Sequence, residues 1–251
     1  MNDLIGLLKN HFDVQKGMYF SNCIQKDGYL YFLSDIITDG YWNYACRLDG
    51  TNLAEPSIDQ VFFDHSRPSS IYVINSEEKP MMSGFELISE ESFMVYKSET
   101  TRLNDMFIVK RAEKGKSMDD FINVFTSAYG GEKSPEQPYG ELDGTYVDAL
   151  IRSFDNDEQF HHFVCYNGDE AVSVASLCTK DKMAGLYNVG TSPAGRGHGY
   201  GTAVTLACIK DWQEGNGKKL FLQTETGSVV EKWYQKLGFE TVFIGRIYSK
   251  E

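Results

Sequence analysis

The stretch that decides the fold runs from Val189 to Val204 and reads VGTSPAGRGHGYGTAV. Glycine occupies every second position from Gly195 to Gly201, and an apolar run follows directly. Glycines are placed where the backbone needs a positive φ or where another group approaches closely. A bare turn before a helix exposes the first N–H groups, which attract phosphate oxygens. The stretch therefore predicts a phosphate-binding turn between a strand and a helix.

Two common phosphate-binding patterns do not fit this turn. The G-x-G-x-x-G pattern fails because its third glycine would fall on Tyr200, Thr202 or Val204. A P-loop fails because the turn has no G-K-[S/T] sequence. What remains has the form R-x-x-G-x-G, beginning at Arg196.

Strands and helices are expected to alternate around this turn, from about residue 107 onward. We expect strands at 107–112, 160–168, 170–179, 184–192, 220–225 and 239–249. We expect helices at 117–130, 144–154 and 228–237, and one that follows the glycines and ends in the sequence EGNGKK. An Asn-Gly-Asp turn favours a hairpin between the second and third strands. The predicted fold class is α/β (α+β), with a mixed sheet flanked by helices.

The first 105 or so residues are less regular. Aromatic-rich alternating runs at 28–37 and 41–48 suggest antiparallel strands. The tripeptide at 84–86, Gly-Phe-Glu, recurs at 238–240, and each copy precedes an alternating stretch. We predict two domains, 1–104 and 105–251. The first is a smaller α+β domain and either a degenerate relative of the second or an unrelated domain in which the repeated tripeptide is chance.

Composition excludes several classes of protein. The net charge of −12 argues against a nucleic-acid partner, because phosphate backbones bind basic surfaces. Apolar runs fall well short of the roughly 20 residues that span a bilayer, and the N-terminus lacks a signal-peptide pattern. The five cysteines form no metal-binding cluster and fit a reducing compartment. We expect a cytoplasmic protein with no metal centre, membrane or nucleic-acid partner.

The stretch VGTSPAGRGHGYGTA, followed by KWYQKLGFE at 232–240, resembles the GNAT superfamily of acyl-CoA-dependent N-acyltransferases. The resemblance covers about residues 105–251 and implies a mixed, splayed sheet with acetyl-CoA, or coenzyme A after transfer, as the cosubstrate. It implies that main-chain groups of Val189 and Thr191 pair with the pantetheine arm. It also implies that the turn binds the pyrophosphate through Arg196, Gly197, His198, Gly199, Tyr200, Gly201 and Thr202.

The same resemblance implies direct attack of an amine on the thioester, with Tyr234 as the acid that protonates the leaving thiolate. The alternative for Tyr234 is a ring packed in the core. The acceptor is a small-molecule or peptide amine. Because the acyl-CoA site could also serve a sensor without turnover, a non-catalytic acyl-CoA-binding module is the alternative function.

The sequence alone does not identify the general base. Related histone-type enzymes carry a glutamate where this chain has Gly185. Glu225 at a strand end could act as the base, directly or through water, or simply face solvent, and a residue of the first domain could serve instead. Alternatively, the amine arrives already neutral or loses its proton to a chain of water molecules. Many relatives also carry asparagine and alanine where this chain has Gly227 and Val230.

Several other reactive side chains are expected to have structural roles. His161 and His162 are adjacent on a strand and so point to opposite faces, which prevents them from acting as a pair. Cys178 and Cys208 are expected to be small core residues, and Trp233 is expected to serve packing.

Overall fold

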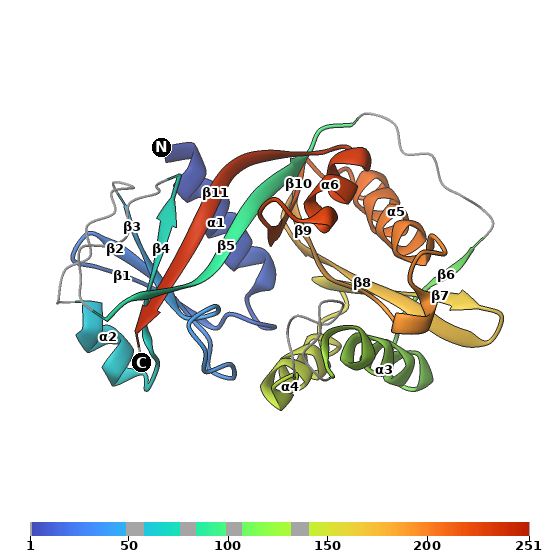
Figure 1. Ribbon diagram of the computed structural model, residues 1–251, viewed down its shortest axis with the longest axis horizontal. Helices are drawn as coiled ribbons and strands as arrows, with labels where there is room; N and C mark the ends of the chain where they lie inside the picture. Colours follow the sequence, from blue (N-terminus) through green and yellow to red (C-terminus); the bar gives the residue numbers. More distant parts are fainter. Residues whose placement is uncertain (1, 49–57, 76–83, 99–106, 132–140, 251) are drawn as a thin grey trace. The chain divides into compact units, whose positions relative to one another are not determined.

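The computed structural model describes residues 2–48, 58–75, 84–98, 107–131 and 141–250. The chain forms two compact units: unit 1 comprises 1–98 and 221–251, and unit 2 comprises 99–220. Both units combine helices with β-strands (Figure 1), so the predicted mixed α+β class is confirmed. The predicted domain boundary between residues 104 and 105 lies outside the described residues and stays a prediction.

Unit 2 contains an antiparallel sheet with helices on both faces. Its strands follow the order β6 (Ile108–Arg111), β7 (Phe160–Asn167), β8 (Glu170–Lys180) and β9 (Met183–Thr191). Its helices are α3 (Lys116–Tyr129), α4 (Gly144–Ser153) and α5 (Tyr200–Glu214). Figure 1 shows α3 and α5 on opposite faces of this sheet. Because both helices pack on β8, that strand is buried from Val172 to Cys178.

Local sequence explains where these elements begin and turn. Asp143 caps α4, since its side chain accepts a hydrogen bond of 2.8 Å from the Thr145 N–H. Gly168 takes a positive φ of 62° in the turn between β7 and β8, as the predicted hairpin requires. No described helix is long and apolar enough to cross a membrane.

Unit 1 also contains one sheet and its own helices. The strand order is β1 (Asn22–Lys26), β2 (Tyr29–Leu33), β3 (Tyr44–Arg47), β4 (Ser69–Ile74), β11 (Phe239–Lys250), β5 (Glu86–Tyr96) and β10 (Lys219–Glu225). The helices are α1 (Asn2–Gln15), α2 (Ile58–Asp64) and α6 (Val229–Lys236). Strands β3 and β4 pair in parallel, whereas the other neighbours pair antiparallel. The predicted strand runs at 28–37 and 41–48 correspond to the antiparallel pair β2 and β3.

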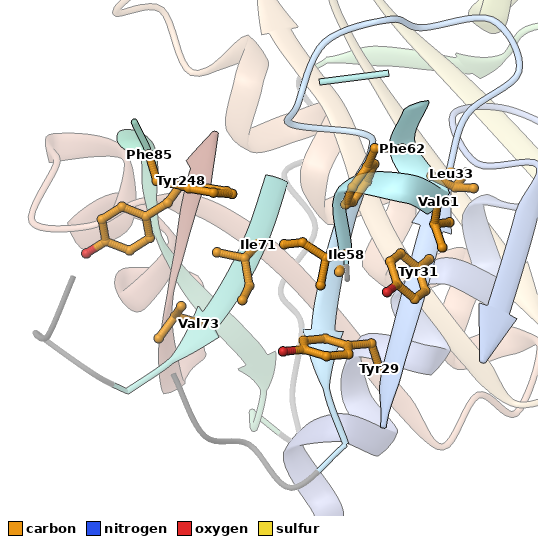
Figure 2. Packing of buried hydrophobic residues seen from close by; sticks show 11 residues of the cluster. Tyr29, Tyr31, Leu33, Ile58, Val61, Phe62, Ile71, Val73, Phe85 and Tyr248 are labelled. Carbon is orange, nitrogen blue, oxygen red and sulfur yellow. The ribbon is translucent and has the colours of Figure 1, made fainter. Parts of the chain in front are cut away.

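Aromatic side chains build a core under α2 in unit 1. Figure 2 shows Tyr31 of β2 beside Phe62 of α2, and their ring centroids lie 5.7 Å apart. Ile71 and Val73 of β4 and Tyr248 of β11 belong to the same cluster. Since β2 and β4 are buried at every position, both faces of these strands are covered.

Strands β5 and β11 pair along their length with a two-fold symmetric register. The pairing skips one residue on each strand, Ile88 on β5 and Val242 on β11. The same offset along the chain relates Gly84 to Gly238, Ile88 to Val242 and Glu91 to its own partner Gly245. Strand β4 pairs on the outer side of β11 and β10 on the outer side of β5. The repeated Gly-Phe-Glu tripeptides thus begin two symmetry-related strands.

Candidate active site

The glycine turn of unit 2 joins strand β9 to helix α5. A short 3-10 turn, Pro193–Gly195, follows the strand. Gly197 and Gly199 then take φ values of 80° and 89°, a region that side chains disfavour. The first intrahelical bond joins the Ala203 N–H to the Gly199 carbonyl at 3.0 Å. The N–H groups at the very start of the helix therefore lack acceptors within it.

At Gly197 the surface of the turn consists of backbone that no neighbouring side chain covers. A Cβ atom at Gly197 would meet nothing within 4 Å, whereas one at Gly199 would lie 3.4 Å from Phe107. The His198 ring folds back, with its Nδ1 2.9 Å from the Arg196 carbonyl. The Tyr200 ring packs edge-on against Phe107 at a centroid distance of 5.2 Å. A helix N-terminus with an uncovered glycine is suited to bind an anion.

Arg196 ties the start of the turn to helix α3. Its Nη2 donates to the Ala128 carbonyl at 3.3 Å, one residue before the end of α3. A cation is stabilised there because carbonyl groups give the helix C-terminus partial negative charge. In this geometry the Arg196 side chain anchors the turn, and the glycines form its open surface.

Strand β9 carries a bulge directly before the turn. Its register with β8 shifts between Gly190 and Tyr187, so Asn188 and Val189 together face Ala175. Asn188 has a φ of 55°, which asparagine tolerates better than most residues. The extra residue lies directly before Gly190. A bulge interrupts the ladder and redirects backbone groups.

The main-chain groups of Val189 and Thr191, which are predicted to bind the pantetheine arm, differ in their hydrogen-bond partners. The Val189 carbonyl accepts a hydrogen bond of 2.8 Å from the Tyr129 hydroxyl of α3. The Ser192 N–H donates to the Val172 carbonyl of β8 at 2.9 Å. Because successive residues of a strand alternate their backbone groups between its edges, those of Thr191 point away from β8. That direction suits pairing with an extended amide chain.

A series of hydrogen-bonded side chains, buried except for the half-buried Asn188, supports the bulge. The Asn188 Nδ2 donates to the Ser176 Oγ at 3.0 Å, and the Ser176 Oγ lies 2.8 Å from the His162 Nδ1. The His162 Nε2 lies 2.9 Å from the Ser153 Oγ, which donates to the Leu150 carbonyl at 2.6 Å. Four side chains thus connect the bulge to helix α4.

The direction of each hydrogen bond in this series of side chains follows from the bond between Ser153 and the Leu150 carbonyl. Ser153 has one hydroxyl proton and donates it to a carbonyl, so it accepts from His162 Nε2–H. The Nδ1 atom of His162 then accepts a hydrogen bond from the Ser176 hydroxyl. Burial lowers the pKa of His162 to about 3, with smaller contributions from His161 and Arg111. His162 is therefore neutral and structural, while His161 contacts Asp211 of α5 at 2.5 Å on the opposite face.

The position of the family glutamate on β9 is filled by an aromatic ring. A Cβ atom at Gly185 would lie 2.3 Å from the Tyr187 ring and 2.6 Å from its hydroxyl oxygen. Tyr187 therefore covers Gly185, and a carboxylate side chain has no room at that position. Position 185 therefore supplies no base for an acyl transfer in this chain.

Tyr234 lies on α6 in unit 1, apart in the chain from the turn. Its side chain is 6% exposed, with the Phe239 ring centroid at 5.7 Å and that of Trp233 at 4.6 Å. The start of α6 is fixed by Glu231, which receives the Gly227 N–H and the Thr241 hydroxyl, each at 2.7 Å. Tyr234 is therefore a largely buried ring packed against Phe239 and Trp233.

The remaining predicted residues also have defined places. Glu225 ends β10 and is exposed. Cys178 and Cys208 are fully buried, and burial raises the pKa of both thiols, as expected for core residues. Asn188 was not predicted from the sequence, although asparagine is enriched among residues with a positive φ.

Residues 158–241 match the family model of the acetyltransferase (GNAT) domain. No curated protein matches the chain. Many solved structures share the fold, among them three that are each at most 14% identical to this chain.

Two of these structures cover nearly all of the chain. A GCN5-related N-acetyltransferase from Kribbella flavida has a TM-score of 0.67 at 14% identity, covering 98% of this chain and 95% of that chain. A functionally unknown conserved protein from Staphylococcus epidermidis has a TM-score of 0.65 at 12% identity, covering 92% and 94%. A tandem GNAT protein from the clavulanic acid biosynthesis pathway has a TM-score of 0.54 at 10% identity, covering 89% and 78%.

The family match extends over the glycine turn, strand β10 and Tyr234. This match, over about a third of the chain, confirms the resemblance drawn from the sequence for residues 158–241. The match and the shared fold support acyl transfer as the class of chemistry.

Proposed function

We propose that this protein is an N-acetyltransferase that transfers the acetyl group of acetyl-CoA to a primary amine by direct attack in a ternary complex. The observation that carries the proposal is the open glycine turn at the start of α5, directly after the bulged strand β9. The amine is a small molecule or part of a peptide, and a cytoplasmic location fits the widely spaced cysteines.

The turn and the bulged strand bind different parts of the cofactor. The N–H groups from Gly197 to Gly201 bind the pyrophosphate, and the Thr202 hydroxyl contributes to the same site. Main-chain groups of Val189 and Thr191 pair with the pantetheine arm, which directs the thioester toward the acceptor. Bare backbone is needed at Gly197 because a side chain there would occupy the place of the phosphate.

Tyr234 is the acid in this proposal. A tyrosine hydroxyl has an unperturbed pKa near 10, so it is protonated at neutral pH and can donate to the departing thiolate. The retained tyrosine favours an enzyme over the alternative, a sensor that binds acyl-CoA without turnover.

The first 104 residues are proposed as a degenerate copy of the acetyltransferase fold. The symmetric register of β5 and β11 supports this proposal, because the skipped residues Ile88 and Val242 follow the two Gly-Phe-Glu tripeptides at the same distance. Unrelated strands are not expected to share both the tripeptide and a skipped residue at the same distance after it.

Cofactor binding is tested by calorimetric titration of acetyl-CoA, coenzyme A and pantetheine. We expect both CoA species to bind and pantetheine, which lacks the diphosphate, to bind weakly. Gly197→Glu should weaken CoA binding by more than about tenfold, because it adds a negative charge at the anion site.

The matched control for this variant is Gly168→Glu. Gly168 also has a positive φ, 62° against 80° at Gly197, and a Cβ atom there also meets nothing within 4 Å. The control should bind like the wild type. Equal binding by Gly197→Glu would contradict the phosphate site, and a wild type that binds neither CoA species would contradict the whole proposal.

Turnover separates the enzyme from the sensor. We expect thiol release from acetyl-CoA in the presence of a suitable primary amine, and we expect Tyr234→Phe to lower kcat by roughly a hundredfold with acetyl-CoA affinity unchanged. Unchanged turnover in Tyr234→Phe would make Tyr234 a packing residue. Tight acetyl-CoA binding without thiol release across the amine panel would favour the sensor.

A further inference from the structure

One hydrogen bond in unit 2 engages a backbone group that the proposed function assigns to the cofactor. The Tyr129 hydroxyl, at the end of α3, donates to the Val189 carbonyl of β9 at 2.8 Å. Val189 belongs to the bulge of β9, and Thr191 follows two residues later at the end of the strand. The Val189 carbonyl therefore already has a donor from the chain itself in the absence of a ligand.

The Val189 carbonyl points away from β8, toward the edge of β9 where the pantetheine arm is proposed to pair. The Ser192 N–H donates to the Val172 carbonyl of β8. Backbone groups two residues apart in a strand point to the same edge, so the Gly190 N–H also points toward β8, where Gly190 pairs with Val174. The Val189 carbonyl shares a trans peptide unit with this N–H and therefore points in the opposite direction.

The last turn of α3 packs closely on this part of β9. A Cβ atom at Gly190 would lie 2.8 Å from the Ala128 Cβ and 3.1 Å from the Tyr129 ring. Arg196 adds a second link, since its Nη2 donates to the Ala128 carbonyl at 3.3 Å. Because Gly190 has no side chain, the Tyr129 ring can lie against the strand with its hydroxyl at the Val189 carbonyl.

The distance of this hydroxyl from the strand is that of a donor in a β-ladder. A chain that pairs with a strand lies about 4.8 Å from it and places its N–H nitrogens about 2.9 Å from the carbonyl oxygens. The Tyr129 hydroxyl oxygen lies 2.8 Å from the Val189 carbonyl oxygen. An amide N–H of the pantetheine arm that pairs with Val189 therefore needs the acceptor that the hydroxyl occupies.

Resting on the proposed acetyl-CoA site, we propose that Tyr129 sets the affinity for the pantetheine arm, because its hydroxyl competes with the arm for the Val189 carbonyl. In the free protein the hydroxyl binds this carbonyl, and in the complex an amide N–H of the arm replaces it. Tyr129 is half-buried, so its hydroxyl can bind water after the exchange and no buried polar group is left unsatisfied. The diphosphate binds at the glycine turn and does not compete.

The competition is tested by calorimetric titration of coenzyme A and ADP into the wild type and Tyr129→Phe. ADP carries a diphosphate and lacks the pantetheine arm. Tyr129→Phe keeps the ring and removes the hydroxyl. It should bind coenzyme A about two- to tenfold more tightly than the wild type, the range that corresponds to one competing hydrogen bond. Its affinity for ADP should be unchanged.

Tyr166→Phe is the matched control. The Tyr166 hydroxyl of β7 donates to the Asp120 carboxylate of α3 at 3.0 Å, so this variant also removes a hydroxyl that links α3 to the sheet. It should bind both ligands like the wild type, because neither residue belongs to β9 or to the glycine turn. An equal gain in coenzyme A affinity in this control would overturn the proposal, since a loosened α3 would then explain the effect.

The remaining outcomes separate the competition from the proposed function. Coenzyme A affinity that is unchanged or lower in Tyr129→Phe would overturn the competition and leave the proposed function intact. An equal gain for ADP would also overturn it, because the effect would then arise at the glycine turn. A wild type that binds neither ligand would overturn both. If Tyr129→Phe fails to fold, Tyr129→Leu, which also lacks the hydroxyl, decides in the same way.

Discussion

Asn188 illustrates how one residue combines backbone and side-chain roles. Its positive φ forms the bulge of β9, and its amide begins the hydrogen-bond chain through Ser176 and His162. Glycine could supply the conformation without the hydrogen bond, whereas most other residues supply neither. Asn188 therefore favours the bulge both through its backbone conformation and through its side-chain hydrogen bond.

Two substitutions at this position separate the two roles. Asn188→Gly keeps the backbone conformation and should lower the free energy of unfolding by about 1 kcal/mol through the lost hydrogen bond. Asn188→Ala also strains the backbone and should cost roughly 1 kcal/mol more. Urea denaturation measures both values. Equal losses would mean that the positive φ contributes nothing, and a stable alanine variant would contradict the role of the bulge.

At the scale of elements, the final strands of the two sequence halves are exchanged. Strand β5, from the first half, pairs with β10 and β11 of the second half. Strand β11 in turn pairs with β4 of the first half. Both neighbours of β11 and one neighbour of β10 therefore come from the first half of the sequence.

We expect residues 105–251 expressed alone to aggregate, because β10 and β11 would lose every partner that the first half provides in unit 1. Coexpression of 1–104 and 105–251 as separate chains should restore a soluble complex. Size-exclusion chromatography and circular dichroism measure both outcomes. A monomeric, cooperatively unfolding 105–251 fragment would show that the exchanged strands are dispensable.

Predictability also differed between elements. The helices and strands after residue 107 were predicted from periodicity and turn residues, and the structure contains each of them. Helices α1 and α2 and strands β1, β4 and β5 were not predicted. Strand β4 is buried at every position, so it lacks the alternation by which a half-buried strand is recognised.

At the scale of the whole molecule, buried titratable groups make stability depend on pH in opposite directions. Burial lowers the pKa of His11 and of His162 to about 3. The unfolded chain binds protons at these sites below about pH 6.5, so stability is lost as the pH falls from there toward 3. Glu91, with its pKa raised to about 7, works in the opposite sense. Its folded form binds the proton more tightly, so stability is gained as the pH falls from 7 to about 4.5.

The contribution of Glu91 is measurable without any substrate. Relative to the wild type, Glu91→Gln should become less stable by up to about 3 kcal/mol as the pH falls from 7.5 to 4.5, at about 1.4 kcal/mol per pKa unit. Urea denaturation at both values measures this difference, and Glu86→Gln should show none. A constant difference between wild type and Glu91→Gln would mean that Glu91 does not titrate in this range.

The sequence by itself determined the glycine turn and the order of the elements from residue 107 onward. These features depend on residues close together in the chain, such as the glycines from 195 to 201, whose backbone requirements are local. Only the tertiary structure decided that Tyr187 covers Gly185, that β5 and β11 exchange partners, and that Glu91 meets Tyr41 and Tyr72. Contacts between residues far apart in sequence depend on strand register and side-chain direction, and neither is encoded in a local pattern.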